Sequence, residues 1–178
     1  MVALDVVLQL CGAFYVFAGF VLARAILASR VADHAIAALS GKKRAERDAI
    51  KEGYSLVLAF ATFISGVAVL VLSTWAVPAF LTAAAAQAVY LFAIAPRYLD
   101  EAGQGLPEGR RQSTNAFVIF CAVAAFVVWG AAKERLRPLA DIPEWQVLAA
   151  LAAILVFAIH IGHGLWQTRA QGLQRPPD

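Results

Sequence analysis

The sequence predicts an all-α membrane protein, a bundle of five transmembrane helices. Hydrophobic residues make up 61% of the 178 residues and the mean hydropathy is +0.70, whereas soluble domains are about 45–50% apolar. A chain of this length could not hide such a surplus in one small core, because a small domain leaves much of its surface in contact with solvent. The charged residues, 15% of the chain, gather between the apolar stretches. Lipid is therefore the expected solvent.

Five apolar stretches are long enough to cross the membrane, since about 30 Å of hydrocarbon takes about 20 residues of helix. Each must be helical, because lipid offers no hydrogen-bond partner to a bare backbone amide or carbonyl. A membrane barrel is excluded, because apolar and polar residues do not alternate along these stretches. The expected spans are residues 4–21, 54–74, 77–95, 115–132 and 147–165.

The first helix is expected to continue beyond the membrane. Residues 25–39 keep apolar positions among the charged ones, and residues 42–51 lead into the second span without a helix breaker. We therefore expect a cytoplasmic helical extension over about residues 25–53, and the whole chain 1–178 as one membrane domain. The second and third spans are joined by residues 75–78 alone, which predicts a tight antiparallel hairpin.

Lysine and arginine predict the orientation, because positively charged loops stay in the cytoplasm. Twelve of the fifteen fall in residues 24–51, 97–111 and 169–175, which share one side if there are five spans; Lys133, Arg135 and Arg137 fall on the other. The N-terminus is thus expected outside and the C-terminus in the cytoplasm, in a bacterial cytoplasmic membrane. The basic segment 42–51 is expected to contact anionic lipid, and nucleic acid is not an expected partner.

Motifs of catalysis are missing from the sequence: it holds no phosphate-binding glycine loop, no paired-cysteine motif and no nucleophile elbow. We therefore do not expect an enzyme, although an enzyme that acts on lipid stays open. Small residues recur four apart in the third and fifth spans, as they do where membrane helices pack closely. This pattern favours an accessory or scaffolding subunit of a membrane complex, or a homo-oligomer, in contact with the lipid bilayer.

His160 and His163 are the pair that could hold a cofactor. They stand three residues apart and so point to nearly the same face of the fifth span. They cannot be the two opposite axial ligands of one haem, and a tetrahedral metal site needs about four ligands. The third histidine, His34, lies beyond the cytoplasmic end of the first span. Three interpretations stay open: structural histidines, a haem or transition-metal site, or proton transfer.

Gln87 places an amide in the middle of the third span, where it needs polar partners. If the hairpin turns at residues 76–77, Gln87 lies level with Ser65, and Ser65 or Thr62 could bond to it. One interpretation is a structural bond between helices, and the other is a polar path through a passive channel or carrier. Active transport is not favoured, because intramembrane charge is nearly absent.

Arg97 and Tyr98 follow the third span directly. Long cations and tyrosine rings are typical of the membrane–water boundary, where the polar tip meets water and the stem stays in lipid. We expect this pair to anchor the end of the third span at the interface.

The topology makes a direct prediction about the chain termini. A tag at the N-terminus should be reached by a protease only from outside the cell, and a tag at the C-terminus only from the cytoplasm. Protease protection in intact and inverted membrane vesicles measures this. Both tags becoming accessible from one compartment would remove one of the five crossings.

Overall fold

The computed structural model describes residues 2–40, 46–99 and 107–173. Its elements follow the predicted order of helices, and six of them carry the five membrane spans, because two consecutive elements form the third span. In chain order they are α1 (Val2–Ser40), α2 (Glu46–Leu70), α3 (Ala76–Val89), the π-helical segment η1 (Tyr90–Leu99), α4 (Pro107–Ala132), the short 3₁₀ helix η2 (Leu139–Asp141) and α5 (Glu144–Leu173).

The fold class is confirmed, because five helices are long and apolar enough to cross a membrane. The chain is thus a small multi-pass membrane protein, and its outward-facing apolar side chains identify the lipid bilayer as its surroundings. The apolar stretches of these helices are Ala3–Asp33, Ile50–Leu70, Ala76–Pro96, Arg111–Ala132 and Glu144–Gln167. The second helix ends at Leu70 rather than Thr74, because Leu72 turns the chain with a positive φ of 53°.

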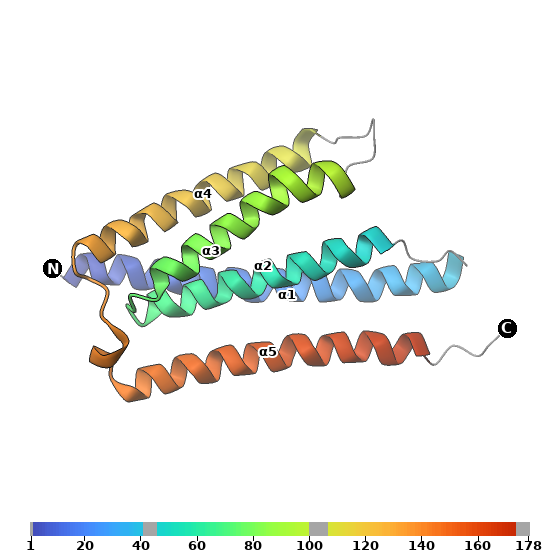
Figure 1. Cartoon of the computed structure of the whole chain (residues 1–178). Helices are drawn as coiled ribbons and strands as arrows, with labels where there is room; N and C mark the ends of the chain where they lie inside the picture. Colours follow the sequence, from blue (N-terminus) through green and yellow to red (C-terminus); the bar gives the residue numbers. More distant parts are fainter. Residues whose placement is uncertain (1, 41–45, 100–106, 174–178) are drawn as a thin grey trace.

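The helices form three layers (Figure 1). The pair α1 and α2 lies in the middle, α3 and α4 cover one side of this pair, and α5 runs along the other. The start of α1, the α2–α3 turn and the α4–α5 linker share one end of the bundle, here called the linker end. The helices α1 and α5 finish at the opposite end, called the far end, where α2 and α4 begin.

Glycines bring α1 and α2 into backbone contact. A Cβ added at Gly66 of α2 would lie 2.5 Å from the Val16 nitrogen and 2.8 Å from the Gly12 carbonyl oxygen of α1. A Cβ at Gly19 would lie 2.8 Å from the Ala59 carbonyl oxygen. No side chain fits at Gly12, Gly19 or Gly66. These glycines therefore let the two backbones approach closely and gain van der Waals contact, as membrane helices require.

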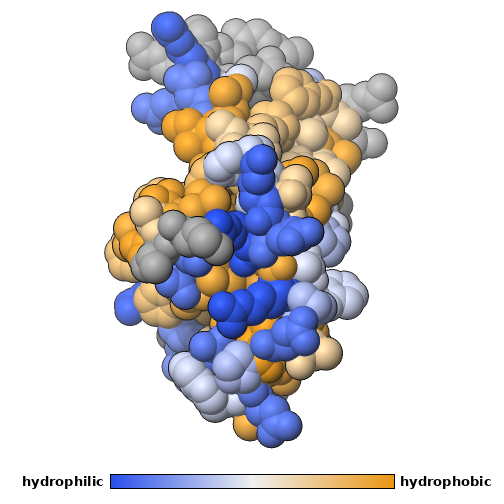
Figure 2. All heavy atoms as spheres, turned by 90° about the vertical axis from the view of Figure 1, so that its left-hand side faces the viewer, coloured by the Kyte–Doolittle hydropathy of each residue, from blue (hydrophilic) through white to orange (hydrophobic). Residues whose placement is uncertain are grey.

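Backbone hydrogen bonds tie the α2–α3 turn to the α4–α5 linker. The Arg137 N–H donates to the Leu72 carbonyl at 2.7 Å, and the Thr74 N–H donates to the Arg137 carbonyl at 2.9 Å. An ion pair of 4.0 Å joins Arg135 to Asp5 of α1. Figure 2 looks onto this end, where hydrophilic residues gather across the middle and lower part of the surface and hydrophobic residues occupy the flanks. The distribution is that of a bundle end facing water.

The glycine contact predicts a large stability difference between two similar substitutions. Gly66→Val should lower the free energy of unfolding by about 1–3 kcal/mol, because the new side chain meets backbone that cannot move aside. Gly53→Ala is the control on the same helix, since its Cβ would meet nothing within 4 Å; it should raise stability by up to about 1 kcal/mol through helix propensity. Thermal unfolding in detergent measures both. Equal effects of the two variants would contradict the close contact.

Candidate functional site

Polar side chains line a cavity between α1, α2, α3 and α4, here called the vestibule. Its volume is about 380 Å³, within the range of pockets that bind small molecules. Hydroxyl groups and one amide face it in an otherwise apolar setting. The lining consists of Leu22, Ser55, Leu58, Thr62, Gln87, Tyr90, Leu91, Ser113, Ala116 and Phe117. None of these residues carries a charge.

The vestibule extends from the far end to the middle of the bundle. Ser113 lies near the start of α4, at the far end. Thr62 lies eight residues before the linker end of α2, a distance of about 12 Å at 1.5 Å per residue. Gln87 lies eleven residues into α3, a distance of about 16 Å. The two polar residues thus stand near the midplane of a hydrocarbon layer about 30 Å thick.

The π-helical segment η1 shapes one wall of the vestibule. Pro96 lies within it; proline removes a backbone N–H and its ring collides with the carbonyl four residues earlier. Widening the helix to the π form accommodates that collision, and such segments frequently occur at functional sites. The Tyr54 hydroxyl of α2 donates to the Ala86 carbonyl at 2.9 Å. Its ring stacks on Tyr90 with centroids 5.3 Å apart, which fixes the start of η1 against α2.

The structure brings Gln87 and Thr62 to one cavity but not Ser65. The Ser65 hydroxyl is buried and donates to the Ala61 carbonyl of its own helix at 2.8 Å. Within the described part of the chain, no hydrogen bond joins Gln87 to Thr62 or Ser65. The reason is the position of the turn. It occupies residues 71–75 instead of residues 76–77, so Gln87 lies closer to the first half of α2 than expected.

An aromatic cluster lies on the linker side of the vestibule. The ring of Tyr15 contacts those of Phe80 and Phe120 edge-on, each with centroids 5.3 Å apart, and Phe80 stacks on Phe120 at 5.2 Å. Leu8, Val69 and Val127 pack into the same cluster and are fully buried. Apolar side chains therefore fill the interior of the bundle toward the linker end.

His160 and His163 occupy different surroundings. The His160 ring lies 5.5 Å from the Phe20 ring, and its Nε2 atom is buried without a hydrogen-bond partner. His163 is exposed, with its Nε2 2.8 Å from the Gln167 amide nitrogen. Among the residues that the structure describes, no three His, Cys, Asp or Glu side chains stand close enough to share a metal. Binding of haem or metal by this pair stays a prediction.

Two predicted interface contacts fall outside the described side chains. Arg97 and Tyr98 belong to η1, and the structure describes their backbone but not their side chains. Residues 42–45 of the predicted lipid-binding segment 42–51 lie outside the described residues. The extension over residues 25–53 is helical in the parts described, as far as Ser40 and again from Glu46.

No protein-family model, curated protein or solved structure matches the chain. The class of protein is therefore defined by the five apolar helices alone, as a small integral membrane protein.

The sequence alone did not place Ser55, Tyr90 and Ser113 at this cavity. Two of them follow a helical spacing that marks one face. Ser55 and Thr62 stand seven residues apart on α2, and Gln87 and Tyr90 stand three apart on the third span, so each pair shares a face. Ser113 carries no comparable signal, because only the packing of α4 against α3 brings it to the vestibule.

The position of Gln87 predicts how its removal affects stability. Gln87→Leu should leave the free energy of unfolding unchanged or slightly higher, because no bond to α2 is lost. Tyr54→Phe should lower it by about 0.6 kcal/mol, since the bond to the Ala86 carbonyl disappears. Unfolding of both variants in the same detergent provides the comparison. If Gln87→Leu lowered the free energy of unfolding as much as Tyr54→Phe does, Gln87 would make a structural hydrogen bond between helices.

Proposed function

We propose that the protein is a passive carrier for a small, uncharged polar solute, which binds in the vestibule. The observation that carries this proposal is the convergence of Thr62 and Gln87 on one cavity at the membrane midplane. Polar groups at this depth are costly, and in membrane proteins they mark substrate paths.

The lining indicates the chemistry of the solute. The Gln87 amide both donates and accepts hydrogen bonds, and the hydroxyls of Ser55 and Thr62 do the same. An ionic solute would need an opposite charge to offset its loss of hydration, and the described residues of the lining include none. Neutral molecules with amide or hydroxyl groups match this surface.

The absence of charge also favours facilitated over active transport. Ion-coupled carriers place carboxylates or cations inside the membrane, where they pair or bind the driving ion. Two ion pairs in the described part of this chain lie near the bundle ends, Asp5 with Arg135 and Arg30 with Glu52. The described residues of the vestibule supply only neutral groups, so a solute would move down its own gradient.

Release to the other side requires the rings of Tyr15, Phe80 and Phe120 to separate. Phe80 and Gln87 belong to the same helix, seven residues apart. A movement of α3 relative to α1 and α2 would therefore displace the closing ring and the binding amide together. This coupling is what a carrier with one solute site needs, because the site and its barrier change in one step.

Reconstituted liposomes test the proposal. Liposomes with the protein should swell in gradients of urea, glycerol or a small amide faster than empty ones. Gln87→Leu or Thr62→Val should reduce this flux by about tenfold, the equivalent of one lost hydrogen bond. Gln9→Leu is the control, because Gln9 lies at the linker end of α1 and outside the lining. Flux that Gln87→Leu leaves intact would refute the vestibule as the path.

A second candidate is assembly, as an accessory or scaffolding subunit or as a homo-oligomer. It is favoured by α5, of whose apolar window only 6% is buried, against 50% for α2. Large side chains of α5, such as Leu151 and Leu155, are exposed. Mass spectrometry of the sample used for flux separates the two candidates. Several copies or a stoichiometric partner, together with wild-type flux no higher than that of empty liposomes, would support assembly and reject the carrier.

A further inference from the structure

A second polar cavity lies between α1 and α2 toward the far end and is here called the forecourt. Its volume is about 330 Å³. Its lining mixes hydroxyl, carboxylate and ammonium groups with apolar side chains and consists of Ala25, Ile26, Ser29, Asp33, Lys51, Glu52 and Ser55. Ser55 lines the vestibule as well. The two cavities therefore adjoin at this residue of α2.

The polar groups of the two cavities form a graded series in depth. Asp33 ends the apolar stretch of α1, and Lys51 stands one residue inside that of α2, so both mark the membrane boundary. Ser29 and Ser55 each lie four residues deeper, about 6 Å at 1.5 Å per residue. Thr62 of the vestibule stands near the midplane. Charged groups at the boundary, hydroxyls below them and neutral polar groups at the midplane provide hydrogen-bond partners along the whole descent.

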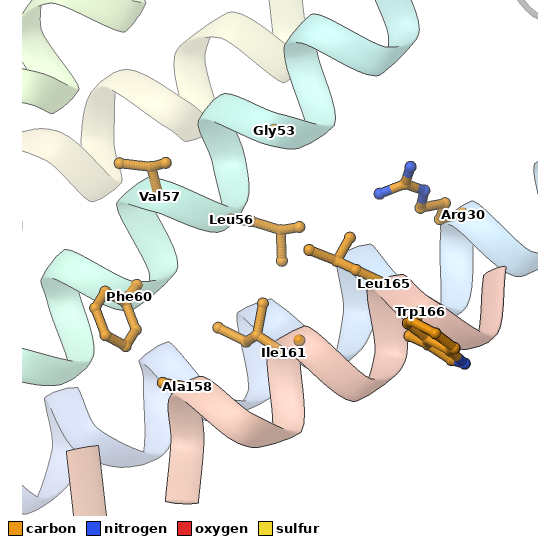
Figure 3. Close-up of a pocket in the computed structure, with 10 residues that line it drawn as sticks. Arg30, Gly53, Leu56, Val57, Phe60, Ala158, Ile161, Leu165 and Trp166 are labelled. Atoms are coloured by element: carbon orange, nitrogen blue, oxygen red, sulfur yellow. The ribbon is translucent and has the colours of Figure 1, made fainter. Parts of the chain in front are cut away.

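The surface of the α1–α2 pair that faces α5 carries a groove of different chemistry (Figure 3). This groove is larger, with a volume of about 600 Å³. Leu56 of α2 and Leu165 of α5 point toward one another across it, and apolar side chains predominate among the described residues of its walls. A polar solute would lose its hydration there without gaining hydrogen bonds. Polarity rather than volume therefore distinguishes the forecourt as a route for such a solute.

The charges of the forecourt balance one another. Glu52 is paired with Arg30 of α1, whose Nε lies 3.6 Å from its carboxylate oxygen. Asp33 and Lys51 are both exposed and come from opposite walls, α1 and α2. A carboxylate accepts hydrogen bonds and an ammonium donates them. A neutral solute with a donor at one end and an acceptor at the other satisfies both walls, whereas an ion would be repelled by one of them.

We propose that the forecourt is the entrance of the carrier and the first binding site of its solute, and that this solute is a small amide or urea. The proposal rests on the carrier function proposed above and narrows its solute class. The solute carbonyl accepts from Lys51, and the solute N–H groups donate to Asp33. The solute then passes Ser55 and reaches Gln87 in the vestibule. Amides are favoured over polyols because an amide group has a dipole of about 3.5 D, which aligns between the two opposite charges.

The passage is tested by cysteine labelling with iodoacetamide, itself a small neutral amide. Thr62→Cys, combined with Cys11→Ala and Cys121→Ala, reports on access to the vestibule in open membrane fragments. Ala25→Trp fills the forecourt and should slow this labelling about tenfold, because a thiol reacts only where the reagent and water reach it. Ala158→Trp is the matched control, since it fills the groove between α2 and α5 and should leave the rate unchanged. Equal rates with and without Ala25→Trp would overturn the forecourt as the entrance.

Flux into liposomes tests the two charges. The wild type should reach half-maximal flux at a lower concentration of acetamide than of glycerol. Asp33→Asn and Lys51→Gln should each raise the half-saturating concentration of acetamide about fivefold and leave the maximal flux unchanged, because they weaken binding before the barrier. Asp141→Asn, an exposed carboxylate at the linker end, is the matched control and should change neither quantity. Unchanged half-saturation in both forecourt variants would refute the binding site, and faster flux of glycine than of acetamide would refute the neutral solute.

The two measurements separate the forecourt from the carrier itself. Flux that Gln87→Leu abolishes but Ala25→Trp leaves intact would refute the forecourt and leave the carrier standing. Labelling of Thr62→Cys that Ala25→Trp slows, together with wild-type flux no higher than that of empty liposomes, would refute the carrier and keep the forecourt as the route of water to the vestibule. Circular dichroism and thermal unfolding confirm that each variant is folded.

Discussion

The backbone contact between α1 and α2 is the constraint on which the other helices depend. Gly12, Gly19 and Gly66 contribute no side chains of their own to the contact between the two helices, which extends over about two turns. In lipid there is no hydrophobic force to bring apolar helices together, so close packing must supply the attraction. The pair then offers two opposite surfaces, one to α3 and α4 and the other to α5. The vestibule lies on the first of these surfaces, and the open space between α2 and α5 lies on the second.

The two ends of the bundle are built differently. At the linker end, the turn and the linker share backbone hydrogen bonds, Asp5 pairs with Arg135, and aromatic rings fill the interior. Toward the far end, polar residues line one space between the helices and apolar residues line another. The contacts that join the turn, the linker and α1 thus lie at the linker end, and open space lies toward the far end. A site for a solute would require such space.

Hydropathy alone located the spans, because burial in hydrocarbon depends on composition over about 20 residues and not on details. The third span, expected over residues 77–95, agrees with the apolar stretch Ala76–Pro96. The turn before it was misplaced for a local reason. The sequence pattern places Pro78 in the connection between the second and third helices, whereas Pro78 lies in the first turn of α3, where proline is tolerated. The break is made by Leu72, whose left-handed conformation nothing in its residue type announces.

The candidate site was only partly predictable for the same reason. Gln87 stood out because an amide is rare at that depth. Its neighbours depend on where α2 ends and on the π-helical form around Pro96, and both are decided by packing. One of the two partners expected of it, Ser65, instead bonds to the carbonyl four residues earlier, as serine in a helix can. The helical period in the sequence predicts which face of each helix lines such a site. Only the tertiary contacts decide which residues along that face reach it.

The aromatic cluster beyond the vestibule has an electrical consequence. Its three rings and the aliphatic side chains packed against them fill the interior toward the linker end with apolar atoms. Each elementary charge that crosses 100 mV dissipates about 2.3 kcal/mol, so a continuous polar path would drain the energy stored in the membrane potential. An apolar cluster of this kind lets the protein keep a polar cavity in the membrane while the membrane keeps its potential.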